Sequence, residues 1–288
     1  MIAHVAEANE DRGRVVVRLG DFAPSSKAAI AAAVHVAVAF RSEIEGLFIE
    51  DPDLFSACAH GSLREVGPAG RASSKLTASA LGRDAEHFAI AVQRELSIAA
   101  AASSVKFSAH VVRDQTIPAL QAACAQRGPW NIIVFAESIV GADKSELLSA
   151  AVSQVWGTTG YIATGARCAW RSGPIVVVIE DIDHLTGMIR AAERLAAVAG
   201  DPVYVLPVGG DEIALDWLEG EVRLTLGDAS NLTILPRPAH AGSNLVLRSA
   251  IAQTKPRIII ARHGGVLLPL DGAARPLADL GCPVFLVH

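Results

Sequence analysis

The best candidate for ligand chemistry is a short cluster near the C-terminus, Arg262-His263-Gly264-Gly265, which follows the apolar run 258–261. Glycines let backbone N–H groups approach a negatively charged group closely, and an arginine adds a charge-assisted hydrogen bond. The same four residues could instead form only a glycine-rich turn at a strand end. The cluster therefore predicts an anion-binding loop, with a simple turn as the open alternative.

The other reactive residue types form no recognisable catalytic or metal site. Asp183 and His184 could exchange protons, although polar residues at a helix start more often cap the helix. Two serines lack the glycine-flanked turn of a hydrolase nucleophile: Ser138 and Ser243. One acidic turn matches the spacing of no cation-binding loop: Glu50, Asp51 and Asp53. We expect no catalytic residue and no metal ligand, and we expect His35, within an Ala/Val segment, to be a packed or interface histidine.

Buried-strand patterns alternate with helical segments, and the alternation is repeated at half the chain length. Strands are predicted in the first half at 14–19, 43–49, 105–112, 131–136 and 160–164. Strands are predicted in the second half at 174–179, 202–207, 231–235, 257–261 and 283–287. Helices are predicted between them at 25–40, 74–101, 115–127, 144–156, 184–199, 211–219, 240–254 and 273–280. Because β-α alternation produces right-handed crossovers and parallel strands, the predicted fold class is α/β, with two tandem open parallel five-stranded sheets.

The repeat also predicts the domain organisation. Residues 1–13 form a polar N-terminal tail, 14–166 the first domain and 174–288 the second, with the joint at 167–173. The segment 56–72 has no clear period, and 221–226 could be a short extra strand or a loop.

Composition narrows the class of protein. Apolar residues make up 51% of the 288 residues, and charged residues 19%. The net charge is −5 and no basic stripe is visible, which argues against nucleic-acid binding. The longest charge-free run, 28–40, is too short to span a bilayer, and the N-terminus lacks a signal-peptide pattern. The four cysteines have no CxxC spacing. We therefore expect a cytoplasmic protein without disulfides.

Two segments resemble those of the universal stress protein family. DFAPSSKAA, residues 21–29, resembles the family's opening turn and Ala-rich helix, and CPVFLV, residues 282–287, resembles its closing strand. The resemblance implies Rossmann-like domains of the adenine nucleotide alpha hydrolase type that pair through their last strands, 161–163 and 283–287, as a pseudo-dimer. It also implies that adenine and ribose lie near the acid after each first strand, Asp21 or Glu180.

The family's phosphate-binding pattern, Gly-x2-Gly-x9-Gly-Ser/Thr, is missing from both halves. In the first half, one glycine remains between Glu137 and Asp143, two acids that would repel phosphate. In the second half, the glycine spacing is wrong, although the loop is positively charged. The residues expected to form a weak nucleotide site are Asp21, Glu180, Arg262, His263, Gly264 and Gly265.

Three hypotheses for function follow. The leading one is a non-enzymatic cytoplasmic stress-response protein of the universal stress type, with at most weak binding of ATP or another adenine nucleotide. The second is an ATP-binding sensor that hydrolyses nucleotide slowly, which intact glycine loops would favour. The third is a ligand-free interaction scaffold that docks an unknown protein partner through residues 50–82. Besides the internal pseudo-dimer, a homodimer is also possible.

Overall fold

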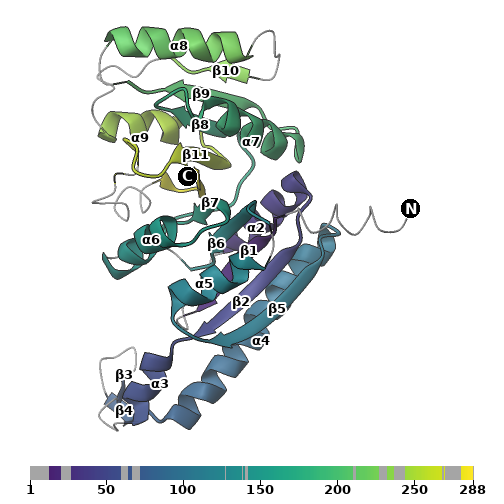
Figure 1. The fold of residues 1–288 in the computed structure, drawn as a ribbon, viewed down its shortest axis with the longest axis vertical. Coiled ribbons are helices and arrows are strands. Elements are labelled where there is room, and N and C mark those ends of the chain that lie inside the picture. Colours follow the sequence, from purple (N-terminus) through teal and green to yellow (C-terminus); the bar gives the residue numbers. More distant parts are fainter. Residues whose placement is uncertain are drawn as a thin grey trace.

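A computed structural model places the strands in one ten-stranded sheet and one two-stranded hairpin. The structure describes residues 13–20, 27–59, 64–66, 72–126, 128–137, 139, 142–209, 212–226, 232–236, 244–267, 269 and 280–287. The order in the large sheet is β10-β9-β8-β11-β12-β7-β6-β1-β2-β5 (Figure 1). The first five strands of this sheet along the chain are β1 (Val15–Gly20), β2 (Ile44–Glu50), β5 (Phe107–Arg113), β6 (Asn131–Phe135) and β7 (Thr158–Ala163). The second five are β8 (Ile175–Ile179), β9 (Val203–Pro207), β10 (Leu232–Ile234), β11 (Ile258–Arg262) and β12 (Val284–Val287).

Both sets of five strands have the same order. In each, the first strand lies between the second and the fourth, and all pairings within the set are parallel. The last strands of the two sets, β7 and β12, pair antiparallel with Leu286 opposite Tyr161. This pairing through the last strands is confirmed. It joins two parallel sheets into one and leaves neither last strand as an open edge.

Helices cover both faces of the sheet. One face carries α2 (Lys27–Phe40), α4 (Ala78–Ala102), α7 (Leu185–Ala197) and α8 (Glu212–Leu226). The other carries α5 (Thr116–Ala125), α6 (Ala142–Gln154) and α9 (Asn244–Gln253). The strands read as unbroken apolar runs because both of their faces are buried, as in β8, where all five residues are fully buried. The α/β fold class predicted from the sequence is therefore confirmed.

The two halves also meet through α2 and α7. His35 of α2 is 7% exposed, and its Nε2 lies 2.8 Å from the Leu195 carbonyl oxygen of α7. Trp170, in the segment between β7 and β8, packs edge-on against the His35 ring, with centroids 5.2 Å apart. The Arg257 guanidinium lies over the Trp170 ring, 5.3 Å from its centroid, and pairs with Asp201. His35 is thus the interface histidine that the sequence predicted.

Two regions differ from the predictions, and one predicted helix lies almost entirely outside the described residues. Helix α8 runs on through Leu226 with no strand or loop over 221–226, because Leu215, Leu218 and Val222 follow a helical period and are buried. The segment that lacked a period contains α3 (Pro52–Ala59) and a hairpin of β3 (Arg64–Val66) and β4 (Ala72–Lys75). These additions and α8 lie at opposite ends of the molecule (Figure 1). The helix expected at 273–280 falls almost entirely outside the described residues.

Candidate functional site

The strand order creates two equivalent places for a ligand. In an open parallel sheet, a crevice forms beyond the carboxyl ends of two strands whose connections lead to opposite sides. These pairs are β1 with β6 in the first half and β8 with β11 in the second. The structure brings Glu180, Arg262 and the turn 263–265 together at the second pair. Asp21, the acid expected at the first pair, lies outside the described residues.

The Glu180 carboxylate accepts the backbone hydrogen bond that the glycine loop offers. The Val266 backbone N–H donates to both carboxylate oxygens of Glu180, at 2.9 Å to Oε1 and 2.8 Å to Oε2. Backbone N–H groups of this kind are what a glycine loop offers to a phosphate. The Glu180 carboxylate therefore lies where an external anion would accept the hydrogen bond from the Val266 N–H. Glu180 thus competes directly with an external anion for the Val266 N–H.

The two glycines have separate structural reasons. Gly264 has a φ of +78°, a left-handed conformation that glycine adopts without strain. A Cβ on Gly265 would lie 2.2 Å from Glu180 Oε1 and 2.6 Å from Oε2, so no larger residue fits without displacing the carboxylate. The close approach predicted for these glycines is present. The group that approaches is the protein's own carboxylate.

A second internal acid engages the arginine. Arg262 Nη1 donates to Asp181 Oδ2 at 2.8 Å. Asp181 Oδ1 accepts from the His184 backbone N–H at 3.1 Å and from His184 Nδ1 at 2.8 Å. The Asp181 carboxylate therefore accepts the His184 backbone N–H just before α7, and the His184 ring orients it. Accepting backbone N–H groups near a helix start is the ordinary structural use of polar side chains there. The predicted anion-binding arginine is already paired.

The surroundings shift the pKa values of the two acids in opposite directions. Burial raises the pKa of Glu180, and the hydrogen bond from Val266 and the charge of Arg262 only partly oppose this. Burial also acts to raise the pKa of Asp181, but the hydrogen bonds from His184 and the charges of His184 and Arg262 outweigh it and lower that pKa. Asp181 is thus held ionised by its partners, whereas the Glu180 carboxylate is desolvated against the loop.

The first half has a buried ion pair at the corresponding position. Arg18 of β1 and Glu137, two residues after β6, form a salt bridge, and each is 2% exposed. Lys144 Nζ of α6 lies 3.5 Å from Glu137 Oε1. From the sequence, Glu137 was expected to be an unpaired charge that would repel phosphate. That premise is wrong, because the side chains of Arg18 and Lys144 lie next to the Glu137 carboxylate. The side chain of Asp143, the other expected acid, lies outside the described residues.

The remaining candidates have local structural roles. Glu50 accepts from Arg113, at 2.8 Å from Nη2, and Asp51 accepts from the Asp53 backbone N–H at 2.8 Å. Within the described ranges, no three His, Cys, Asp or Glu side chains are grouped so that they could hold a metal ion. Ser138 and Ser243 lie outside those ranges. The acidic turn is therefore explained by its own hydrogen bonds.

Sequence reasoning missed Arg18, Asp181 and Val266. Arg18 could have been found, because an arginine inside the otherwise apolar strand VVVRLG must be paired when both faces of the sheet are covered. Asp181 follows Glu180 directly and is the nearer acid to Arg262. Val266 contributes through its backbone alone, for which no side-chain signal exists.

Solved structures with the same architecture span nearly the whole chain. A universal stress protein from Archaeoglobus fulgidus DSM 4304 has a TM-score of 0.58 and 12% identity, covering 95% of this chain and 96% of its own. The chain has the universal stress protein fold. A functionally unknown protein from Pseudomonas aeruginosa PAO1 has a TM-score of 0.53 and 15% identity, with 98% and 94% covered. A proposed universal stress protein from Pseudomonas aeruginosa UCBPP-PA14 has a TM-score of 0.53 and 14% identity, with 97% and 94% covered.

The universal stress protein fold predicted from residues 21–29 and 282–287 is thus confirmed. The sequence matches no protein-family model and no curated protein. Among the described residues, no helix combines the length and the apolar character needed to cross a membrane.

Proposed function

We propose that this chain is a non-enzymatic protein of the universal stress type that acts in the cytoplasmic stress response and has lost strong adenine-nucleotide binding. The observation that carries the proposal is the hydrogen bonding of the Glu180 carboxylate to the Val266 N–H. A nucleotide phosphate at this loop must displace a tethered carboxylate, and it must also compete with Asp181 for Arg262. Both replacements reduce the net gain from binding, because the donors are already satisfied.

The absence of catalysis is proposed from the state of the candidate groups. His184 is committed to Asp181, because both its backbone N–H and its Nδ1 contact Asp181 Oδ1. Burial raises the pKa of Cys124 and of Cys168 to about 12, and it raises the pKa of Cys282 as well. Thiols with such values carry little thiolate near neutral pH and are poor nucleophiles.

The cytoplasmic location is proposed from the cysteines. All four are free: Cys58, Cys124, Cys168 and Cys282. Four free thiols, three of them buried, fit a reducing compartment. The β7–β12 pairing supports an internal pseudo-dimer, since it uses within one chain the contact that two separate copies would otherwise form.

The two alternatives are less well supported. The slow ATP hydrolase needs a phosphate loop with open donors, and Val266 donates to Glu180 instead. The scaffold hypothesis assigned docking to 50–82, but among the described residues the large exposed apolar side chains lie on other elements, such as Ile213, Trp217 and Leu224 of α8. We therefore retain the first proposal.

The test combines native mass spectrometry of freshly purified protein with calorimetric titration of ATP and an assay for phosphate release. We expect no co-purified nucleotide, a Kd for ATP of about 0.1 mM or weaker, and no release above background. A micromolar Kd would contradict the loss of binding, and turnover that His184→Ala abolishes would contradict the non-enzymatic proposal. The same spectra report whether one chain or two make up the particle.

A further inference from the structure

A pocket of about 520 Å³ lies at the seam between the two halves, and its lining residues His184 and Val287 adjoin the candidate site at the end of β11. Because β7 and β12 run antiparallel, the amino ends of the first-half strands lie beside the carboxyl end of β12. The pocket is bounded there by Trp130 and Thr159 on one side and by Phe285 on the other, with α2 and α7 completing it. Its volume is within the range of small-molecule sites.

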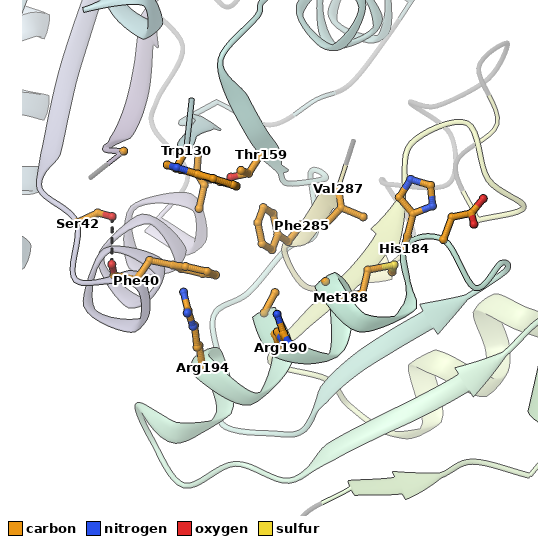
Figure 2. A pocket seen from close by; sticks show the side chains of 15 residues that line it. Phe40, Ser42, Trp130, Thr159, His184, Met188, Arg190, Arg194, Phe285 and Val287 are labelled. Carbon is orange, nitrogen blue, oxygen red and sulfur yellow. Dashed lines mark hydrogen bonds between the residues drawn. The ribbon is translucent and has the colours of Figure 1, made fainter. Parts of the chain in front are cut away.

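The lining combines aromatic rings with cations. Figure 2 shows Phe40, Trp130 and Phe285 around a common space, with Arg190 and Arg194 of α7 along its lower border. Trp130 is 62% exposed, which is a large apolar surface for water to contact. A flat apolar ligand in this space would cover the indole and contact the two phenyl rings.

The two arginines give the pocket a preference for anions. They are one helical turn apart, so both guanidinium groups reach the same side of α7. The Arg194 guanidinium lies 5.6 Å from the centroid of the Phe40 ring, and neither arginine forms an ion pair with another described residue. Among the described lining residues, the one acid is Asp183, which precedes α7 at its opposite end beside His184. An arginine fork binds a carboxylate in two-point geometry.

Gly187 has no side chain, and this keeps part of the pocket open. Gly187 lines the pocket from the same face of α7 as Arg190 and Arg194, and a Cβ placed there meets no atom within 4 Å. A larger residue at this position would extend into the pocket without disturbing the backbone. Gly220 in α8 has equally open surroundings and does not line the pocket, so it provides a matched control.

We propose that the seam pocket binds a small aromatic carboxylate, with its ring among Phe40, Trp130 and Phe285 and its carboxylate on Arg190 and Arg194. The five side chains that would contact the ligand include none of the groups at the ends of β8 and β11, so the proposal is independent of the proposed loss of nucleotide binding. It gives the protein a ligand of a chemical class other than adenine nucleotides.

The test is calorimetric titration of the full chain with 1-naphthoate and with its neutral analogue 1-naphthamide. We expect a Kd of about 1 mM or tighter for the carboxylate, as its size allows, and binding at least about tenfold weaker for the amide because it lacks the charge. The double variant Arg190→Gln/Arg194→Gln should weaken naphthoate by about tenfold or more. Gly187→Leu should abolish binding, whereas Gly220→Leu should leave it unchanged. Arg223→Gln should also leave it unchanged, because Arg223 lies on α8, pairs with Glu219 and does not line the pocket.

Circular dichroism of every variant confirms folding. Three results would overturn the proposal: no saturable binding of 1-naphthoate to the wild type, equal affinity for naphthoate and naphthamide, or equal effects of Gly187→Leu and Gly220→Leu. Equal affinity for the two compounds would mean that the aromatic ring alone causes binding and that the arginines do not recognise the carboxylate.

Discussion

The buried pair of Arg18 and Glu137 makes a sharp prediction about stability. Each side chain is 2% exposed, so removal of one partner leaves the other charge desolvated inside the first-half sheet. Loss of one partner of such a pair costs about 3–5 kcal/mol. Arg18→Met should fall near the lower end, because Lys144 remains 3.5 Å from the Glu137 carboxylate. Glu137→Leu should fall near the upper end, because it removes the carboxylate that faces the Arg18 guanidinium.

Urea unfolding followed by circular dichroism measures these costs. The double variant Arg18→Met/Glu137→Leu should recover to within about 1 kcal/mol of the wild type, since an apolar pair of similar volume removes both desolvated charges. The control is Arg113→Met, which breaks the half-exposed pair with Glu50 and should cost about 1 kcal/mol or less. Single costs below about 1 kcal/mol, or costs that simply add in the double variant, would refute the reasoning.

Two further predictions concern the interface histidine and the glycine loop. Burial lowers the pKa of His35, although the hydrogen bond to the Leu195 carbonyl opposes this shift. In the unfolded chain the histidine pKa is about 6.5, so the unfolded state takes up a proton at a higher pH than the folded state does. The free energy of unfolding should therefore be highest above this pKa and should fall as the pH decreases below it. The melting temperature of the wild type should therefore drop between pH 7 and pH 5.5 by more than that of His35→Gln, and equal drops would contradict this. Gly265→Ala should destabilise by about 1–3 kcal/mol through its clash with Glu180, whereas Gly220→Ala should stabilise by about 0.5–1 kcal/mol. Adding Glu180→Ala should relieve the clash in urea unfolding, and an unrelieved cost would place the strain elsewhere.

The sequence was most informative where both faces of a strand are buried. The run 175–179 is apolar at every position, which predicts a central parallel strand and is observed as β8. The end of α8 was missed: the predicted helix ended at 219, whereas α8 continues through Gly220 to Leu226. A glycine within a helix costs only about 1 kcal/mol, and burial of Leu218 and Val222 exceeds that cost.

The sequence predicted which residues of the candidate site meet, but it did not predict their contacts with one another. Glu180, Arg262 and the two glycines do meet at one sheet edge, as the order of strands requires. The sequence could not show that the longer side chain of a glutamate reaches the Val266 N–H, since that contact depends on the path of the turn 262–265. The seam pocket was equally hidden, because it is made by residues of both halves brought together by the β7–β12 register.

The most direct test of the central claim follows the Val266 amide by ¹H–¹⁵N nuclear magnetic resonance during titration with inorganic phosphate. In the wild type, the amide should stay unshifted, because the Glu180 carboxylate already accepts its hydrogen bond. In Glu180→Ala, the amide should shift in a saturable way with a Kd of about 1–10 mM, since a freed donor and Arg262 can then hold the anion. Glu50→Ala, which removes a carboxylate from the end of β2, should behave as the wild type. An amide that shifts equally in the wild type, or that stays unshifted in a folded Glu180→Ala, would contradict the account.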